Sequence, residues 1–127
     1  MYKILKKTQF SEKVFEFRVE APQMAKKAHA GQFLMVRANE QGERVTGPLG
    51  NPTELEGDRV VVLGGGVGLA IAYPVARTFC EQGKKVSVIM GARTKDLLIL
   101  TDQFKALPLE GLYITTDDGS EGEKGVV

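Results

Sequence analysis

A cluster of glycines directly after a short apolar run is the part of this sequence with the clearest potential for chemistry. Residues 60–63 are three valines and a leucine, and the cluster that follows them consists of Gly64, Gly65, Gly66, Val67 and Gly68. A strand, a glycine turn and a helix in this order suit a dinucleotide pyrophosphate, because glycines let the backbone approach the phosphates and the free N–H groups at the helix start face negative charge. The spacing departs from the strict G-x-G-x-x-G pattern, so the cluster alone also fits a tight turn that binds nothing.

Two further loops carry residues of types that contact nucleotides. Ala92 and Arg93 follow the apolar run 85–90, where dinucleotide-binding proteins place the residue that contacts the adenosine ribose or its 2′-phosphate. We predict such a contact for Arg93, and a solvated loop arginine is the alternative. Asp118 and Gly119 allow three interpretations: a contact in the nucleotide crevice, a simple turn, or a metal-binding pair of Asp118 with its neighbour Asp117.

The pattern of residues 58–127 alternates between strands and helices, and this alternation would bring the loops together. We expect strands over 60–63, 85–90 and 112–116 and helices over 69–81 and 96–107. The continuous apolar run of the first strand predicts that it is buried. Such an order forms a parallel sheet with right-handed crossovers, as in the mononucleotide-binding half of a Rossmann-like domain. Ligands of these sheets bind at the carboxyl ends of the strands, so three loops converge on one crevice.

The front of the chain has a different pattern, which is β-rich and antiparallel in character. Residues 13–20 alternate apolar and charged side chains, residues 2–9 do so weakly, and residues 32–37 resemble a third strand. Residues 24–30 favour a short helical turn or a loop, and residues 47–52 have turn-forming types without regular structure. We therefore expect an α/β protein with two parts, an antiparallel segment over 1–57 and a nucleotide-binding half-domain over 58–127.

The composition excludes several classes of function. Seventeen basic residues against sixteen acidic ones leave a net charge of +1, so nothing indicates a nucleic acid or an anionic membrane as partner. No apolar run approaches the roughly 18–20 residues that a bilayer requires, and the N-terminus lacks the features of a signal peptide, so we expect a cytoplasmic protein. No catalytic triad, carboxylate pair or metal-ligand cluster is evident, so no residue is assigned to hydrolysis or to a metal.

The single cysteine and the single histidine both have ordinary interpretations. Cys80 lies on the first predicted helix, where a small buried apolar role is favoured over a reactive one. His29 lies in a polar loop without an evident partner, so a surface role is favoured over catalysis.

Three motifs together resemble one known family. The segments 64–70, 91–98 and 116–120 occur in the order and spacing of the pyridine-nucleotide half of the ferredoxin–NADP reductase superfamily. The sequence is most similar to its flavin-bearing electron-transfer subunits, including those of dihydroorotate dehydrogenase, NADH-dependent ferredoxin–NADP oxidoreductase and the sulfhydrogenases. The segments 30–36 and 47–50 are similar to the flavin barrel of that branch and to the hinge between its domains.

The resemblance implies a function and a set of cofactors. It implies an NAD(P)H-dependent flavin oxidoreductase subunit, which passes hydride between NAD(P)H and FAD and passes electrons on to an iron–sulfur partner. By this resemblance Arg44 would neutralise the flavin phosphate. It also implies a partner oxidoreductase subunit or self-association. A non-catalytic nucleotide-binding or subunit-docking module that has lost its flavin is the alternative function.

The departures from the family pattern bear on the cofactors. The family places an Arg-x-Pro-Leu-Thr/Ser segment and three more strands where Thr46 here runs straight into Gly47, so much of the flavin barrel is missing. Family members also continue past the position of Val127 to a cysteine-rich stretch that holds a [2Fe–2S] cluster, whose ligands are absent here. The chain is therefore a reduced protein, a fragment, or one that skips residues of a longer parent.

Overall fold

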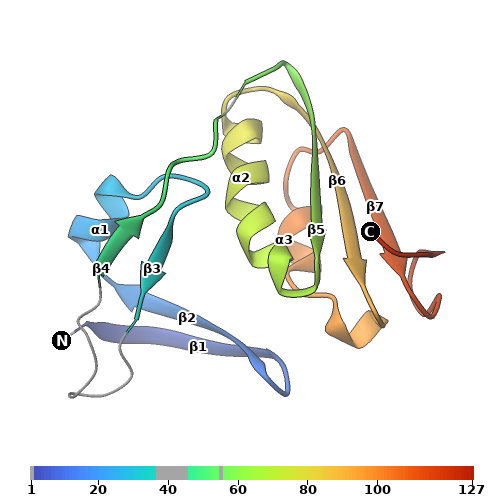
Figure 1. Ribbon diagram of the computed structural model, residues 1–127, viewed down its shortest axis with the longest axis horizontal. Helices are drawn as coiled ribbons and strands as arrows, with labels where there is room; N and C mark the ends of the chain where they lie inside the picture. Colours follow the sequence, from blue (N-terminus) through green and yellow to red (C-terminus); the bar gives the residue numbers. More distant parts are fainter. Residues whose placement is uncertain (1, 37–45, 55) are drawn as a thin grey trace.

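The computed structural model describes residues 2–36, 46–54 and 56–127 of the chain. In the front half, β1 (Lys3–Ser11) and β2 (Val14–Glu20) form an antiparallel hairpin, and a short helix α1 (Pro22–Lys27) follows. The pair β3 (Phe33–Met35) and β4 (Thr46–Leu49) is also antiparallel and forms a second two-stranded sheet (Figure 1). The expectation that residues 47–49 lack regular structure is therefore wrong. The strand β4 contains a proline, which a sheet tolerates here because β4 is short and pairs with only one other strand.

The second half contains a four-stranded parallel sheet in the order β5-β6-β7-β8. Its elements in chain order are β5 (Arg59–Gly65), the 3₁₀ turn η1 (Gly66–Gly68), α2 (Leu69–Glu81), β6 (Lys85–Ala92), η2 (Lys95–Leu97), α3 (Thr101–Lys105), β7 (Gly111–Thr116) and β8 (Glu123–Lys124). Antiparallel strand pairs followed by a parallel sheet with crossover helices confirm the predicted α/β class. The bounds predicted for the first helix match those of α2.

The helix predicted over 96–107 is wrong, because the chain breaks it into η2 and α3. Leu98 has an extended backbone, and Leu100 has a φ of 60° in the left-handed region, so a helical hydrogen-bond ladder does not run through this segment. The non-helical stretch places Ile99 in the core at 3% exposure. Burial of this side chain therefore prevails over the helical periodicity of the sequence.

An apolar core lies between the sheet and the two helices. From α2, Leu69, Ala76 and Phe79 pack against Val88 and its neighbours on β6. The ring of Phe104 on α3 is fully buried, and it meets the ring of Tyr73 edge to face with centroids 5.3 Å apart. Both helices therefore cover the same face of the sheet. Partly buried residues of the front hairpin, Phe10 and Val14, also pack against this core.

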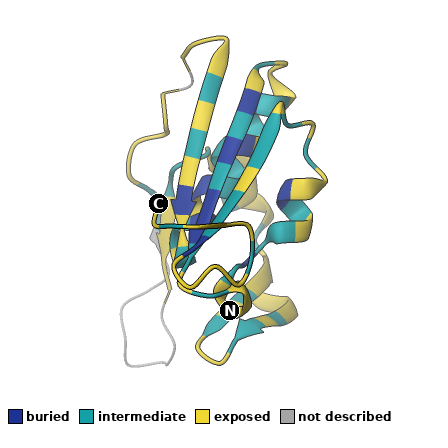
Figure 2. Ribbon diagram, turned by 90° about the vertical axis from the view of Figure 1, so that its right-hand side faces the viewer, coloured by how far each residue is buried: buried dark blue, intermediate teal, exposed yellow. Residues whose placement is uncertain are grey.

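The opposite face of the sheet carries no helix among the described residues, and much of it is exposed. Val61 and Leu63 of β5 are 56% and 58% exposed, and Tyr113 of β7 is 59% exposed. Figure 2 shows the alternation of exposed and covered residues along β5. The prediction that β5 is buried is therefore wrong for one of its faces, because this part of the chain supplies helices to only one side of the sheet.

Candidate functional site

A crevice of about 400 Å³ lies at the carboxyl edge of the parallel sheet. It is lined by Gly65, Gly66, Gly91, Ala92, Arg93, Leu97, Asp117, Val126 and Val127. A second hollow of about 480 Å³, by Asp58, Lys84 and Lys85, lies where β5 and β6 begin. We place the candidate site in the first crevice, although it is the smaller one, because the glycine turn and the loops predicted from the sequence meet there.

The glycines of the turn have different structural roles. A Cβ on Gly64 would lie 2.9 Å from Leu69 Cδ2 and 3.0 Å from the Cβ of Ala72, so this glycine lets α2 pack closely on β5. Gly66 has a φ of +53°, and a Cβ built there would meet no described atom within 4 Å. Gly66 therefore combines a backbone that favours glycine with an open surface that a ligand can approach.

The turn leads directly into the start of α2. Val67 and Gly68 belong to the 3₁₀ turn η1, and α2 begins at Leu69 without a side-chain cap or an acidic residue in its first turn. The N–H of Leu69 already donates to the carbonyls of Gly66 and Val67, so the N–H groups without a helical partner come earlier, at the start of η1. The helix dipole makes this end partly positive. These groups together suit an anion such as a pyrophosphate.

The loops after β6 and β7 are joined to each other by backbone hydrogen bonds. The N–H of Asp117 donates to the carbonyl of Ala92 at 3.1 Å, and that of Asp118 donates to the carbonyl of Arg93 at 3.3 Å. The structure thus brings together the two loops that the sequence singles out. Arg93 is exposed, and its guanidinium forms no ion pair or hydrogen bond with the residues that the structure describes.

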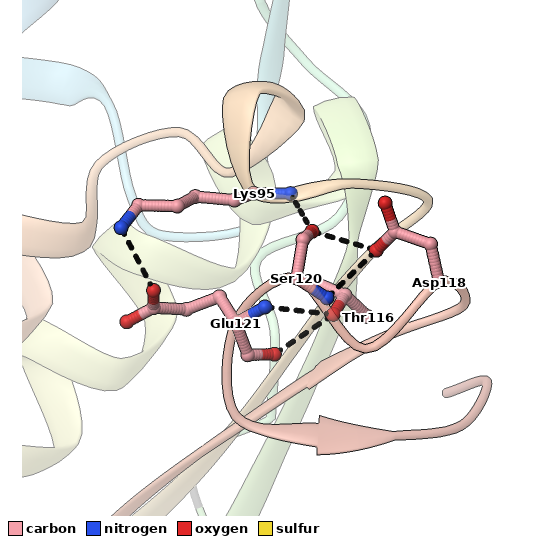
Figure 3. Close-up of polar contacts among 5 residues, drawn as sticks. All are labelled: Lys95, Thr116, Asp118, Ser120 and Glu121. Atoms are coloured by element: carbon pink, nitrogen blue, oxygen red, sulfur yellow. Dashed lines mark hydrogen bonds and ion pairs between the residues drawn. The ribbon is translucent and has the colours of Figure 1, made fainter.

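The carboxylate of Asp118 is held by a residue that the sequence analysis did not select. Oδ1 of Asp118 accepts hydrogen bonds from Ser120 Oγ at 2.6 Å and from the Ser120 N–H at 2.9 Å (Figure 3). The Ser120 side chain first, and then its backbone, hold the pKa of Asp118 below its ordinary value. An Asp-Gly-Ser turn, in which a carboxylate bonds two residues ahead, is the local signal that predicts this contact.

Other candidate residues lie away from this crevice or outside the described part. Arg44 lies outside the described residues, so its predicted flavin contact stays a prediction. Cys80 is half-buried against the core, and its burial, together with the charge of Glu81, raises the pKa of its thiol. The described residues include no group of three or more His, Cys, Asp or Glu side chains that could hold a metal ion. No helix in the described part is long and apolar enough to cross a membrane.

The fold defines a Rossmann-like half-domain, a parallel sheet with crossover helices, preceded by antiparallel strand pairs. No family model matches the sequence. The chain is 36% identical over 165 aligned positions to the dihydroorotate dehydrogenase B (NAD(+)) electron transfer subunit homolog of Thermotoga maritima, covering 98% of this chain and 58% of the relative. It is 42% identical to the probable dihydroorotate dehydrogenase B (NAD(+)) electron transfer subunit of Methanocaldococcus jannaschii, over 64% of this chain and 31% of that one.

A solved structure gives the same assignment. A chain of the NADH-dependent reduced ferredoxin–NADP oxidoreductase, described for flavin-based electron bifurcation, superposes with a TM-score of 0.86 at 35% identity, over 98% of this chain and 59% of that chain. The protein therefore belongs to the electron-transfer subunit branch of the ferredoxin–NADP reductase superfamily.

The chain spans less than two thirds of the length of these relatives, at 58% and 59% for the two long matches. The alignment to the Thermotoga maritima protein runs over 165 positions, more than the 127 residues of the whole chain. The relative therefore has residues within the matched span that have no counterpart here.

Proposed function

We propose that this chain is the pyridine-nucleotide-binding component of a flavin-dependent electron-transfer oxidoreductase. The observation that carries the proposal is Gly66, whose positive φ and open surface lie in the crevice at the start of α2. Relatives named as electron-transfer subunits support the redox role. The proposal includes the binding of NADH or NADPH, the transfer of electrons to an acceptor, and a partner subunit.

The residues of the crevice suggest how the nucleotide is oriented. The pyrophosphate would lie over Gly66 and the first N–H groups of η1. The adenosine would then lie toward β6 and β7. There the guanidinium of Arg93 could pair with a ribose phosphate, and the carboxylate of Asp118 could accept hydrogen bonds from the ribose hydroxyls. Leu97, which is 41% exposed and lines the crevice, offers an apolar surface for the adenine ring. The bound nucleotide supplies the hydride chemistry, and this chain supplies its binding and orientation.

The described residues of the front half do not fit FAD as a complete site. They form two separate two-stranded sheets and no closed barrel. Phe17, Phe33 and Met35 are 52%, 58% and 51% exposed. We therefore propose that flavin, if it serves as the acceptor, is held with the help of another protein chain, and that Cys80 takes no part in an iron–sulfur cluster, which needs four ligands.

A non-catalytic nucleotide-binding or docking module is the second candidate function. The exposed apolar side chains and open strand edges of the front half favour it, since such surfaces promote pairing with another chain.

Titration of the purified chain with NADH and NADPH by calorimetry tests the proposal. We expect saturable binding of at least one of the two nucleotides. Binding without transfer of electrons to any added flavin or partner supports the docking module, and the absence of binding for both nucleotides contradicts the proposal.

Arg93→Ala is expected to weaken NADPH about fivefold more than NADH. The guanidinium can pair with a 2′-phosphate through two charge-assisted hydrogen bonds, whereas a 2′-hydroxyl offers it a single acceptor. Calorimetry with both nucleotides measures the difference. Arg77→Ala is the matched control, because Arg77 is exposed on α2 and pairs with Glu81 at 3.3 Å. Equal small losses for both nucleotides would make Arg93 a solvated loop residue.

The chain as it stands is expected to retain little FAD and to self-associate or pair with a partner. The reason is the incomplete front half, with its separate strand pairs and exposed aromatic rings. Visible absorbance of the purified protein reports the flavin, and size-exclusion chromatography with light scattering reports the mass. A yellow monomer with stoichiometric flavin would contradict this prediction.

A further inference from the structure

The hydroxyl of Ser120 lies between the two loops that line the crevice. Its oxygen accepts a hydrogen bond from the Lys95 N–H at 2.8 Å and donates one to Asp118 Oδ1 at 2.6 Å. Figure 3 shows this oxygen between the backbone of Lys95 on one side and the carboxylate of Asp118 on the other. One side chain therefore connects the loop after β6 to the loop after β7.

The remainder of the loop after β7 is held by Thr116 and Glu121. Thr116 is fully buried at the end of β7, and its hydroxyl donates to the carbonyl of Glu121 at 2.8 Å and accepts from the Glu121 N–H at 3.1 Å. The carboxylate of Glu121 in turn pairs with the ammonium of Lys95 at 3.1 Å. The segment 117–121 is thus held at both ends, and Ser120 is the contact nearest to Asp118.

We propose that Ser120 is a positioning residue for the nucleotide, which fixes the Asp118 carboxylate against the backbone of the loop that carries Arg93, on the adenosine side of the crevice. This inference rests on the proposed function. Arg93 is two residues before Lys95, whose N–H the hydroxyl accepts, and Asp118 is held directly. Groups that are ordered before binding lose less conformational entropy when the ligand arrives. The hydrogen bonds of Ser120 therefore raise nucleotide affinity although Ser120 does not touch the ligand.

The position of Ser120 separates this role from a role in folding. The side chain is exposed and is not part of the apolar core, so its removal leaves no cavity. Exposed substitutions of this kind change the free energy of unfolding little. Removal of the Ser120 hydroxyl should therefore lower nucleotide affinity, and only for ligands that contain the adenosine half of the nucleotide.

The test compares Ser120→Ala with Ser120→Thr, and uses Ser87→Ala on the sheet face without helices as the matched control. Binding of ADP-ribose, 2′-phospho-ADP-ribose and nicotinamide mononucleotide is measured by calorimetry. We expect Ser120→Ala to bind the two adenosine-containing fragments about fivefold more weakly, which is the size of one ordinary lost hydrogen bond, and to leave nicotinamide mononucleotide unchanged. Ser120→Thr should restore the affinity because it keeps the hydroxyl.

A spectroscopic readout tests the contact itself. The NMR titration of the Asp118 carboxyl should show a pKa below the ordinary aspartate value in the natural chain and in Ser120→Thr, and a rise toward that value in Ser120→Ala, because the hydrogen bonds of Ser120 stabilise the ionised form.

The outcomes distinguish this inference from the proposed function. If the natural chain binds none of the probes or intact nucleotides, the proposed function fails. If it binds them and Ser120→Ala binds equally well, or if Ser120→Thr does not restore a loss, the positioning role of Ser120 is overturned.

Discussion

Gly66→Val is expected to reduce nucleotide affinity at least about tenfold, or roughly 1.4 kcal/mol, while the chain stays folded. The valine side chain would point into the open space of the crevice, where the pyrophosphate is proposed to lie. No described atom lies within 4 Å of the added Cβ, so the substitution removes space from the ligand and not from the core. Calorimetry with NADH and NADPH measures the loss.

Gly83→Val is the matched control for this substitution. Gly83 has a φ of +76° and, like Gly66, would place its Cβ within 4 Å of no described atom, but it lies at the opposite end of α2. Both variants therefore carry the same kind of backbone strain. An equal change of affinity in the two variants, or an unchanged affinity in a folded Gly66→Val protein, would contradict the assignment of the glycine turn.

Phe104→Ala is expected to lower the free energy of unfolding by about 3–5 kcal/mol, as is usual when a fully buried phenylalanine is truncated. The side chain is 0% exposed and packs edge to face on Tyr73, so its removal leaves a cavity between α3 and α2. Urea unfolding followed by circular dichroism measures the change.

Phe33→Ala is the control for Phe104→Ala, because its ring is 58% exposed and its loss leaves no core cavity. We expect a change within about 0.5 kcal/mol for this variant, as for most exposed substitutions. Similar losses for the two variants would mean that the core is not where the structure places it.

The sequence predicts well those elements in which local and tertiary preferences agree. The bounds of α2 follow from an apolar stripe between the glycine turn and Gly83, and Pro74 interrupts one hydrogen bond without ending the helix. The strands β6 and β7 are short apolar runs with clear stops, and both are found within two residues of their predicted ends. The boundary between residues 57 and 58 stays a prediction.

The predictions fail where a tertiary contact decides the local structure. Ile99 enters the core from a non-helical stretch, so the apolar spacing of residues 96–107 predicts a helix that does not form. The strand β8 has two charged residues of low strand propensity, and it pairs with β7 next to the Thr116–Glu121 contact. No sequence pattern within either segment predicts these tertiary contacts.

For the candidate site, the sequence predicts the residues better than their interactions. The structure gathers the glycine turn, Ala92 and Arg93 at one edge and places the loop of Asp118 and Gly119 beside them, while their binding role stays a prediction. The part played by Ser120 depends on the spacing between two loops 25 residues apart in sequence, which residue types alone do not specify.

Among the described strands, β5 ends the sheet on one side, so no described strand pairs with its outer edge. A dinucleotide whose adenosine is bound over β6 and β7 would extend its nicotinamide beyond this edge of the sheet. Its redox ring would then remain reachable from outside the chain. Under the proposed function, this chain would bind the nucleotide, and a second protein would accept the hydride.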